Sequence, residues 1–414
     1  MLKKLFKQRR SVEGLQSNPL AAHLDSFAAS LSEDSYAVST VRSKLLWVAQ
    51  LGWWLQKSKL TVAQLDERIV DTFLKELRLQ GQLRRGQGPT TLGFLVHLRN
   101  KGIIPCPDPV CDTSPLAELE RQYERYLTME RGLTSATVVN YRPVVYRFLV
   151  HQYGDGPLHL EDLKASDIST YVLDHAHSQS AKRAQLMATA LRSFFRYLLR
   201  DAKIEVDLAA CVPTVANWRL SSVPKYLSVE EVQSLLDACD RSTSTGRRDY
   251  AVLLLLVHLG LRAGEIVALE IDDIDWRAGE MMVRGKGLFH DRLPLLTEPG
   301  EALAAYLRTD RPRTLTRRVF VRRKAPPAGF AGPSTISTIV RRALERAGLH
   351  PPTKGAHLLR HTLATGMLQR GASMAEIGEV LRHRSANTTE IYAKVDLSGL
   401  RNLAQPWPNA GGAR

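Results

Sequence analysis

Cysteine is scarce in this sequence, with four residues among 414: Cys106, Cys111, Cys211 and Cys239. So few thiols do not build a disulfide scaffold in a chain of this length. Four residues separate Cys106 from Cys111 and no histidine lies close to them, so the spacing fits no common zinc site. We therefore expect reduced, mostly structural thiols and no bound metal.

Long apolar runs are missing as well. The strongest, residues 251–261, is interrupted by His258 and is far too short to cross a bilayer. The N-terminal MLKKLFKQRR is basic but lacks the apolar segment and the small-residue cleavage site of a signal peptide. These absences predict a cytoplasmic protein without a membrane partner.

Acidic residues are outnumbered, because 42 Asp and Glu face 57 Lys and Arg, a formal net charge of +15. Such an excess favours a polyanionic partner, since each phosphate neutralised by Lys or Arg releases condensed counterions. Basic proteins can also simply be soluble, so charge alone does not identify that partner. The hydrophobic content of 44% and the length predict two or three packed domains.

Most of the chain has the three- and four-residue apolar spacing of helices. The first hundred residues repeat the plan of the next hundred: NPLAAHL corresponds to SPLAELE, Thr40 to Thr137, and Leu65 to Leu163. We infer two successive small helical domains of similar build. The alternative is that unrelated amphipathic helices share such spacing.

The apolar period changes in the C-terminal part of the chain. Short segments around residues 271–276, 281–284 and 292–295 are separated by tight turns, of which Gly285-Lys286-Gly287 is one. This pattern predicts a small antiparallel sheet among helices. The expected fold class is therefore mainly α with a small antiparallel β-sheet.

Cutting a phosphodiester without a metal needs a nucleophile, cations that hold the phosphate oxygens, and an acid for the departing oxygen. Arg262 lies between a helix end at Gly260 and a helix start near Ala263, where its guanidinium can reach a phosphate and Glu265 can orient it. Lys286 lies at a hairpin tip, where it can enter a cleft and donate a proton. Taken singly, such residues are usually ordinary surface residues.

Two further segments carry candidate residues. His357 and Arg360 are three apart and share one face of a helix. His383 precedes Tyr392 by nine residues, and Asn387 or Thr388 can cap the helix that we expect to carry the tyrosine. A lone tyrosine on such a helix usually packs into a core.

Four motifs thus follow one another in order: LGLRAGEIVAL, RGKGLFHDRLPL, HLLRHT and LRHRSANTTEIYAKV. Together, over residues 226–397, they resemble the catalytic motifs of tyrosine site-specific recombinases, the phage-integrase family that includes the Xer recombinases. The helices of residues 114–200 look like the core-binding domain of that family. The resemblance implies a tyrosine nucleophile and five activating residues, which are Tyr392 and Arg262, Lys286, His357, Arg360 and His383.

The resemblance also implies a mechanism. The tyrosine forms a 3′-phosphotyrosyl bond and frees a 5′-hydroxyl, without a cofactor, ATP or a metal. The partners are double-stranded DNA recombination sites, bound by a homotetramer or jointly with related recombinases, which makes the protein nucleoid-associated. One departure is Arg382, where the family usually has glycine; we expect it to narrow the turn or to add a phosphate contact. The helical domain at the N-terminus is a second departure.

We therefore divide the chain into six parts. They are a basic N-terminal arm (1–17), an additional helical domain (18–105), a helical core-binding, SAM-like domain (112–205), a linker (206–224), a mixed α/β catalytic domain (225–398) and a C-terminal tail (399–414). The arm is expected to be disordered and to contact phosphates.

Further DNA contacts are predicted from charge density. Residues 308–324 hold seven arginines and one lysine against one aspartate, which suits phosphate contacts by Arg317, Arg318, Arg322 and Arg323. A solvated charged loop is the alternative. Lys182 and Arg183 begin a long helix that resembles the family helix that enters the major groove.

The sequence thus predicts a site-specific DNA recombinase or integrase that integrates or moves a mobile element. Two alternatives stay open at this point. A type IB topoisomerase-like relaxing enzyme uses similar phosphate chemistry, and a non-catalytic DNA-binding protein could retain the same fold.

Overall fold

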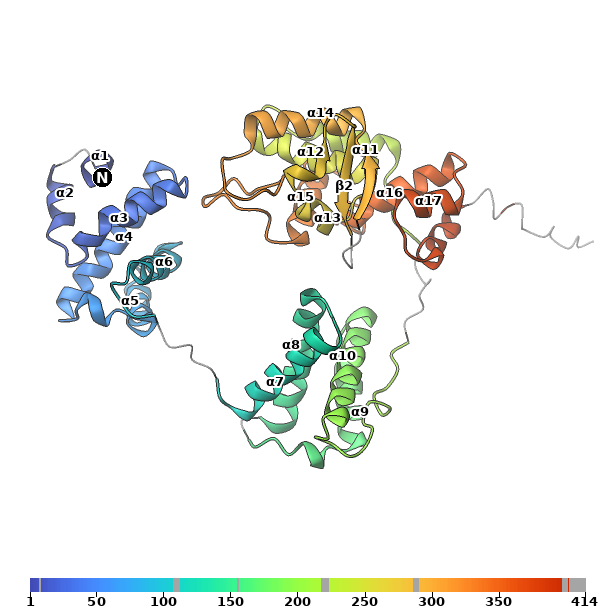
Figure 1. Cartoon of the computed structure of the whole chain (residues 1–414), viewed down its shortest axis with the longest axis horizontal. Coiled ribbons are helices and arrows are strands. Elements are labelled where there is room, and N and C mark those ends of the chain that lie inside the picture. Colours follow the sequence, from blue (N-terminus) through green and yellow to red (C-terminus); the bar gives the residue numbers. More distant parts are fainter. Residues whose placement is uncertain are drawn as a thin grey trace, which may run out of the picture. The chain divides into compact units, whose positions relative to one another are not determined.

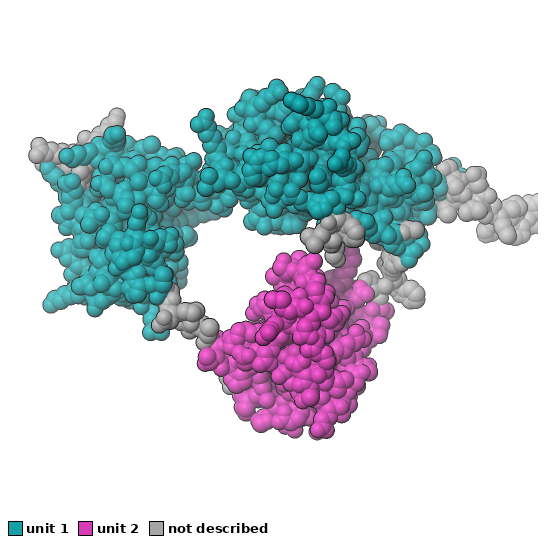
Figure 2. All heavy atoms as spheres, viewed as in Figure 1, with its two compact units in different colours: residues 1–106, 222–414 teal, residues 107–221 magenta. Residues whose placement is uncertain are grey.

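The computed structural model describes residues 1–6, 9–106, 112–154, 156–216, 223–285, 290–396 and 401. Contacts divide the chain into two compact units, residues 1–106 with 222–414 and residues 107–221 (Figure 2). Helices dominate both units (Figure 1), and the described residues form one three-stranded sheet. The predicted fold class is confirmed. No helix in the described part of the chain is long and apolar enough to span a bilayer.

The N-terminal helices share one hydrophobic core. They are α1 (Leu2–Leu5), α2 (Arg9–Gln16), α3 (Ala21–Glu33), α4 (Val38–Lys57), α5 (Glu67–Leu79) and α6 (Gln87–Asn100), with a 3₁₀ turn η1 (Val62–Gln64) before α5. The segment predicted as a basic arm includes α1 and α2. It is folded here, because Leu2, Leu5 and Leu15 are buried with the other apolar side chains of this core.

Unit 2 has a similar succession of elements. It contains α7 (Pro115–Arg125), a π-helical turn η2 (Tyr126–Glu130), α8 (Ser135–Tyr153), a 3₁₀ turn η3 (Leu160–Asp162), α9 (Ala165–Ala176) and α10 (Ala181–Arg200). The turn and helix at positions 160 and 165 follow those at positions 62 and 67 by 98 residues. The repeat inferred from the sequence is therefore present in the order of the elements.

The chain after α10 still packs against unit 2. Leu208, Ala209 and Val212 are buried in its core. The Arg192 guanidinium donates to the carbonyl oxygens of Val212 and Pro213, at 2.9 and 3.0 Å. The first half of the predicted linker is thus held by the helical unit that precedes it.

The C-terminal part combines helices with the sheet. Its elements are α11 (Val229–Asp237), α12 (Ser244–Leu259), α13 (Ala263–Ala268), η4 (Ile271–Asp273), β1 (Ile274–Asp275), β2 (Glu280–Arg284), β3 (His290–Pro294), α14 (Thr297–Ala305), η5 (Tyr306–Asp310), α15 (Pro333–Arg346), α16 (Ala356–Gln369), α17 (Met374–Val380), η6 (Ala386–Thr388) and η7 (Glu390–Val395). The strands are antiparallel, as the sequence predicted, and their order is β1-β2-β3.

Helix α12 is the central element of this core. Residues 251–256 are all fully buried, because α12 contacts α11, α14, α15 and α16. The helix ends at Gly260, whose φ of +56° is in the left-handed region that favours glycine. A Cβ at Gly260 would lie 2.7 and 2.9 Å from side-chain carbons of Leu381 and Leu363. This close approach brings the end of α12 against α16 and the segment after α17.

Candidate active site

Arg262 is held at the junction between α12 and α13. Its backbone N–H donates to Glu265 Oε2, and its Nη1 donates to Glu265 Oε1, both at 2.8 Å. The capping position follows from the extended backbone at Arg262, which ends the turn after Gly260 and starts α13. The prediction that Glu265 orients Arg262 is confirmed.

Arg360 on α16 is almost fully buried and binds two carbonyl oxygens. Its Nη1 donates to Gly260 O and its Nη2 to Leu381 O, while Arg262 Nη2 donates to the next carbonyl, Arg382 O, at 3.3 Å. The two guanidiniums therefore donate hydrogen bonds to the carbonyl oxygens of two consecutive residues. Burial, with the neighbouring charge of Arg262 and then Arg382, lowers the pKa of Arg360 to about 10. Arg360 remains a cation at neutral pH.

Arg382 occupies a backbone position that suits glycine. Its φ is +54°, and its N–H bonds Glu379 O while the His383 N–H bonds Gly378 O, both at 2.8 Å. This pair of bonds is the Schellman ending of α17, in which the residue at this place adopts the left-handed conformation. The glycine that is usual in the family suits this left-handed conformation. The arginine at this position adopts the same conformation at a backbone cost of about 1–2 kcal/mol.

The side chain of Arg382 turns inward to a carboxylate. Its Nη2 lies 2.9 Å from Glu265 Oε2, and both side chains are almost completely buried. Arg382 thus contacts a buried carboxylate in the free protein, and the expectation that it narrows the turn or adds a phosphate contact stays a prediction. Burial acts to raise the pKa of Glu265, but Arg382 and then Arg262 outweigh burial and lower it.

Positive charge is in excess around Glu265. Three guanidiniums, those of Arg262, Arg360 and Arg382, act on this single carboxylate, two of them by direct contact. Arg262 is the most exposed of the three, with 36% of its side chain accessible. An anion beside Arg262 and Arg360 would relieve the repulsion between the guanidiniums, so the cluster is suited to bind a phosphate.

Tyr392 packs with Ile377 and Leu381 in a small apolar cluster beside this charge. Its hydroxyl lies 2.9 Å from Nδ1 of His361. Its ring is parallel to that of His383, with centroids 6.5 Å apart. Burial raises the pKa of Tyr392 to about 12, and the charge of Arg360 acts in the opposite direction. The phenol is therefore protonated at neutral pH.

We expected Tyr392 to lie on a capped α-helix, but it does not. It lies on η7, a 3₁₀ helix of six residues, and neither Asn387 nor Thr388 caps it. The reason is local, because both residues are within the preceding 3₁₀ turn η6, so neither is the residue that directly precedes η7. The residue before η7 is Thr389, whose hydroxyl lies 2.8 Å from His383 Nδ1. The threonine thus orients the histidine.

His361 was not among the catalytic residues predicted from the sequence. It follows Arg360 in HLLRHT, and its position four residues after His357, on the same helix face, was the available signal. Burial, with His357 and Arg360 nearby, lowers its pKa to about 4. Burial and the charges of Arg360 and Arg262 lower the pKa of His383 to about 4 as well. Both rings are therefore neutral at pH 7.

The structure thus brings together four of the six predicted catalytic residues, Arg262, Arg360, His383 and Tyr392. His357 is exposed on α16, with its ring centroid 6.3 Å from that of His361. Lys286 lies outside the described residues, in the connection between β2 and β3.

The predicted DNA-contacting arginines have partners within the protein. Arg317 forms a bidentate ion pair with Asp272, and Arg318 donates to the carbonyl of Ala268. Arg322 and Arg323 also have partners within the protein: Arg322 donates to Pro326 O at 2.8 Å, and Arg323 donates to the Ser244 hydroxyl. In unit 2, Lys182 and Arg183 are exposed in the first turn of α10.

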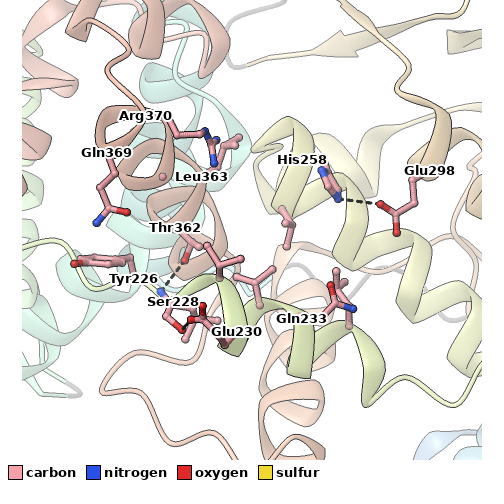
Figure 3. Close-up of a pocket in the computed structure, with 16 residues that line it drawn as sticks. Tyr226, Ser228, Glu230, Gln233, His258, Glu298, Thr362, Leu363, Gln369 and Arg370 are labelled. Atoms are coloured by element: carbon pink, nitrogen blue, oxygen red, sulfur yellow. Dashed lines mark hydrogen bonds and ion pairs between the residues drawn. The ribbon is translucent and has the colours of Figure 1, made fainter.

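A separate pocket of about 590 Å³ lies among α11, α12 and α16 (Figure 3). Its walls include Tyr226, Gln233 and Thr362, and His258 Nε2 lies 3.4 Å from Glu298 Oε2 at one side. None of the predicted catalytic residues lines it. The charged cluster around Tyr392 is therefore the better candidate for the site of chemistry. The described residues contain no group of three or more His, Cys, Asp or Glu side chains placed to hold a metal ion.

Comparison with known proteins supports this choice. The model of the phage integrase family matches residues 225–398, and that of the phage integrase N-terminal SAM-like domain matches residues 121–202. A Sinorhizobium fredii protein named as an integrase/recombinase, y4rA, is 44% identical over 97% of both chains. The chain belongs to the phage integrase family. It is a tyrosine recombinase, an enzyme that breaks and rejoins DNA at specific sites.

Two other relatives of this recombinase extend the comparison. The tyrosine recombinase XerD of Mycobacterium tuberculosis is 33% identical over 68% of this chain and 94% of its own length. The structure of a lambda integrase tetramer bound to a Holliday junction has a TM-score of 0.52 and 19% identity, and the match covers 75% of this chain and 87% of that one. The latter similarity shows a shared fold.

Proposed function

We propose that this recombinase cleaves DNA by attack of the Tyr392 hydroxyl on a backbone phosphate, which gives a 3′-phosphotyrosyl intermediate and a free 5′-hydroxyl. Arg262 and Arg360 bind the phosphate oxygens, His357 and His383 support them, and Lys286 protonates the departing 5′ oxygen. One observation carries the proposal. Arg360 and Arg262 donate hydrogen bonds to the carbonyl oxygens of Leu381 and Arg382, two consecutive residues, and Tyr392 packs against Leu381.

The physical argument rests on charge that develops during the reaction. The attacked phosphate gains negative charge on its oxygens, and fixed cations in a partly buried site stabilise that charge without reorganising. Arg360 is fixed by two carbonyls and Arg262 by Glu265, so both guanidiniums are oriented before DNA arrives. Removal of one such group from a preorganised site costs about 10²–10³ in rate.

The proposal includes an assignment of the remaining parts of the chain. Residues 112–205 form the core-binding domain, 225–398 the catalytic domain, and 18–105 an additional domain that binds accessory DNA sites, extends the DNA clamp or contacts a partner protein. Lys182 and Arg183 contact the duplex from α10. The arginines of residues 317–323 contact phosphates when DNA replaces their partners within the protein.

We also propose that the active assembly is a homotetramer on two double-stranded sites, or a mixed assembly with related recombinases. The lambda integrase tetramer on a Holliday junction supports this by its shared fold. Integration or movement of a mobile element is the biological role that fits best, given the similarity over nearly the full length to a protein named as an integrase/recombinase.

A nicked suicide substrate tests the proposal. Such a DNA loses a short fragment after cleavage, so the covalent protein–DNA adduct accumulates and is seen as a shifted band in a denaturing gel. Wild type should form the adduct, and Tyr392→Phe should bind the same DNA without forming it. An exposed tyrosine of the same domain gives the matched control, Tyr226→Phe. An adduct formed by Tyr392→Phe at the wild-type rate would refute the proposed nucleophile.

A further inference from the structure

The hydroxyl of Tyr392 contacts a residue to which the proposed mechanism gives no role. Nδ1 of His361 lies 2.9 Å from the Tyr392 oxygen, and the two rings meet edge to face with centroids 5.6 Å apart. The contact joins α16 to η7, two elements that are 21 residues apart at their nearest ends, so it depends on the folded structure. A tyrosine that attacks phosphorus must lose its proton, and His361 is in hydrogen-bond reach of it.

The other histidines are less well placed for that proton. His383 uses its Nδ1 for the Thr389 hydroxyl, and its ring lies parallel to the tyrosine ring at 6.5 Å between centroids. His357 is exposed on the turn of α16 before His361. A neutral His361 with its proton on Nε2 leaves Nδ1 as an acceptor that faces the phenol.

We propose that His361 is a catalytic residue, the base that accepts the phenolic proton of Tyr392 during cleavage. As the Tyr392 oxygen bonds to phosphorus, its proton moves to Nδ1 of His361. The bond from phosphorus to the 5′ oxygen breaks, and that oxygen takes a proton from Lys286. In the rejoining step the 5′-hydroxyl attacks phosphorus and gives its proton back to Lys286, and the imidazolium returns its proton to the departing tyrosine oxygen. The inference rests on the proposed function of Tyr392.

The electrostatic surroundings are consistent with this role. The groups that face His361 are His357 and Arg360 on α16, with His383 and Tyr392 on the segment after α17. In the free protein, burial and then His357 and Arg360 lower the pKa of His361 to about 4, so the ring is neutral and has one nitrogen that can accept a proton. A phosphate bound at Arg360 and Arg262 brings negative charge to the same site, which favours the imidazolium as the proton arrives.

Two substitutions separate proton transfer from simple positioning. Asparagine places an amide near the position of Nδ1, so His361→Asn can still hold the phenol by a hydrogen bond but cannot take its proton. His361→Gln is the second variant, in case the first does not fold. His350→Asn is the matched control, because His350 is exposed beyond α15 in the same domain. DNA binding by each variant is measured first by gel shift and reports folding.

The decisive assay is single-turnover cleavage of two suicide substrates, one with the natural 5′ oxygen at the scissile position and one with a bridging 5′ sulfur. A thiolate leaves without protonation, so the sulfur substrate bypasses the acid but not the base. We expect His361→Asn to cleave both substrates about 10²–10⁴-fold more slowly than wild type. Lys286→Ala should be slow on the oxygen substrate and restored on the sulfur substrate, and His350→Asn should match wild type on both.

The outcomes distinguish the inference from the function on which it rests. A His361→Asn or His361→Gln variant that binds DNA and cleaves both substrates at the wild-type rate overturns the inference, and so does restoration by sulfur, which would make His361 an acid. Adduct formation by Tyr392→Phe overturns the proposed nucleophile itself. An inactive Tyr392→Phe together with a fully active His361→Asn leaves the nucleophile in place and removes only the base.

Discussion

Replacement of Arg382 by glycine separates two opposing contributions that the structure assigns to this residue. The backbone at Arg382 has a φ of +54°, which costs a non-glycine residue about 1–2 kcal/mol. The side chain contributes the buried ion pair with Glu265, at 2.9 Å. Removing one partner of a buried pair costs about 3–5 kcal/mol when the other is left unpaired. Glu265 keeps Arg262 at 2.8 Å, so we expect a smaller loss, about 1–3 kcal/mol.

Two variants therefore have different expected stabilities. Arg382→Ala loses the ion pair and keeps the unfavourable backbone, whereas Arg382→Gly loses the ion pair and gains a favourable backbone. The glycine variant should be more stable than the alanine variant by about 1–2 kcal/mol, and wild type should be more stable than the alanine variant. Lys59 is a matched control, because it is exposed and lies two residues after the end of α4 with a φ of +56°.

The assay is hydrogen exchange of backbone amides, which reports opening free energies for each segment of a multidomain chain. We follow amides of α16 and α17 for the Arg382 variants and of α4 for Lys59→Ala and Lys59→Gly. The Lys59 pair should show the same difference between glycine and alanine, with no loss from an ion pair. Equal protection of Arg382→Gly and Arg382→Ala would refute the backbone argument. Protection of Arg382→Ala equal to that of wild type would refute a stabilising pair with Glu265.

The remaining predictions concern the arginine cluster, the histidines and Gly260. Arg360→Ala should bind DNA within about twofold of wild type and cleave it about 10²–10³-fold more slowly. Filter binding measures the first effect and single-turnover cleavage the second. An equal loss of binding and cleavage would show that Arg360 only anchors DNA. The folded state lowers the pKa of both His361 and His383 to about 4, whereas the pKa of an unfolded histidine is about 6.5, so the unfolded chain binds more protons below about pH 6.5. In urea unfolding, the free energy of unfolding should therefore be highest above that pH and should fall as the pH is lowered toward 4. His383→Asn should flatten that fall, and an unchanged slope would contradict the sign. Gly260→Ala should lower the unfolding free energy by roughly 1–3 kcal/mol and slow cleavage, because φ is positive and the Gly260 carbonyl holds Arg360; a neutral effect on both would contradict the close approach.

The elements that local sequence determines were predictable. A long helix begins at Lys182 and Arg183 as expected, within α10, and α12 ends at Gly260. Ser228 and Glu231, three residues apart, form the capping box at the start of α11. Each of these features follows from residues within a few positions of one another, namely an apolar period, a glycine or a cap. The three strands were predictable for the same reason, since their turns carry glycine.

The long-range contacts could not be predicted in this way. The pair Arg382–Glu265 in the site and the pair Arg317–Asp272 outside it join residues 117 and 45 positions apart, and no local pattern encodes such a pairing. His361 adjoins Arg360 in the sequence, but its role depends on η7 placing the phenol against α16. The short 3₁₀ form of η7 was missed because Asn387 and Thr388 look like capping residues, whereas both are used in the turn before it.

The most direct test of the central claim is to locate the covalent bond in the trapped adduct. Wild-type protein is trapped on the suicide substrate, digested with nuclease and trypsin, and analysed by fragmentation mass spectrometry. Trypsin releases residues 385–394, SANTTEIYAK, which contain a single tyrosine. We predict that the nucleotide remnant is on Tyr392 of this peptide. A remnant on any other residue, or an unmodified peptide recovered from a purified adduct, would contradict the account.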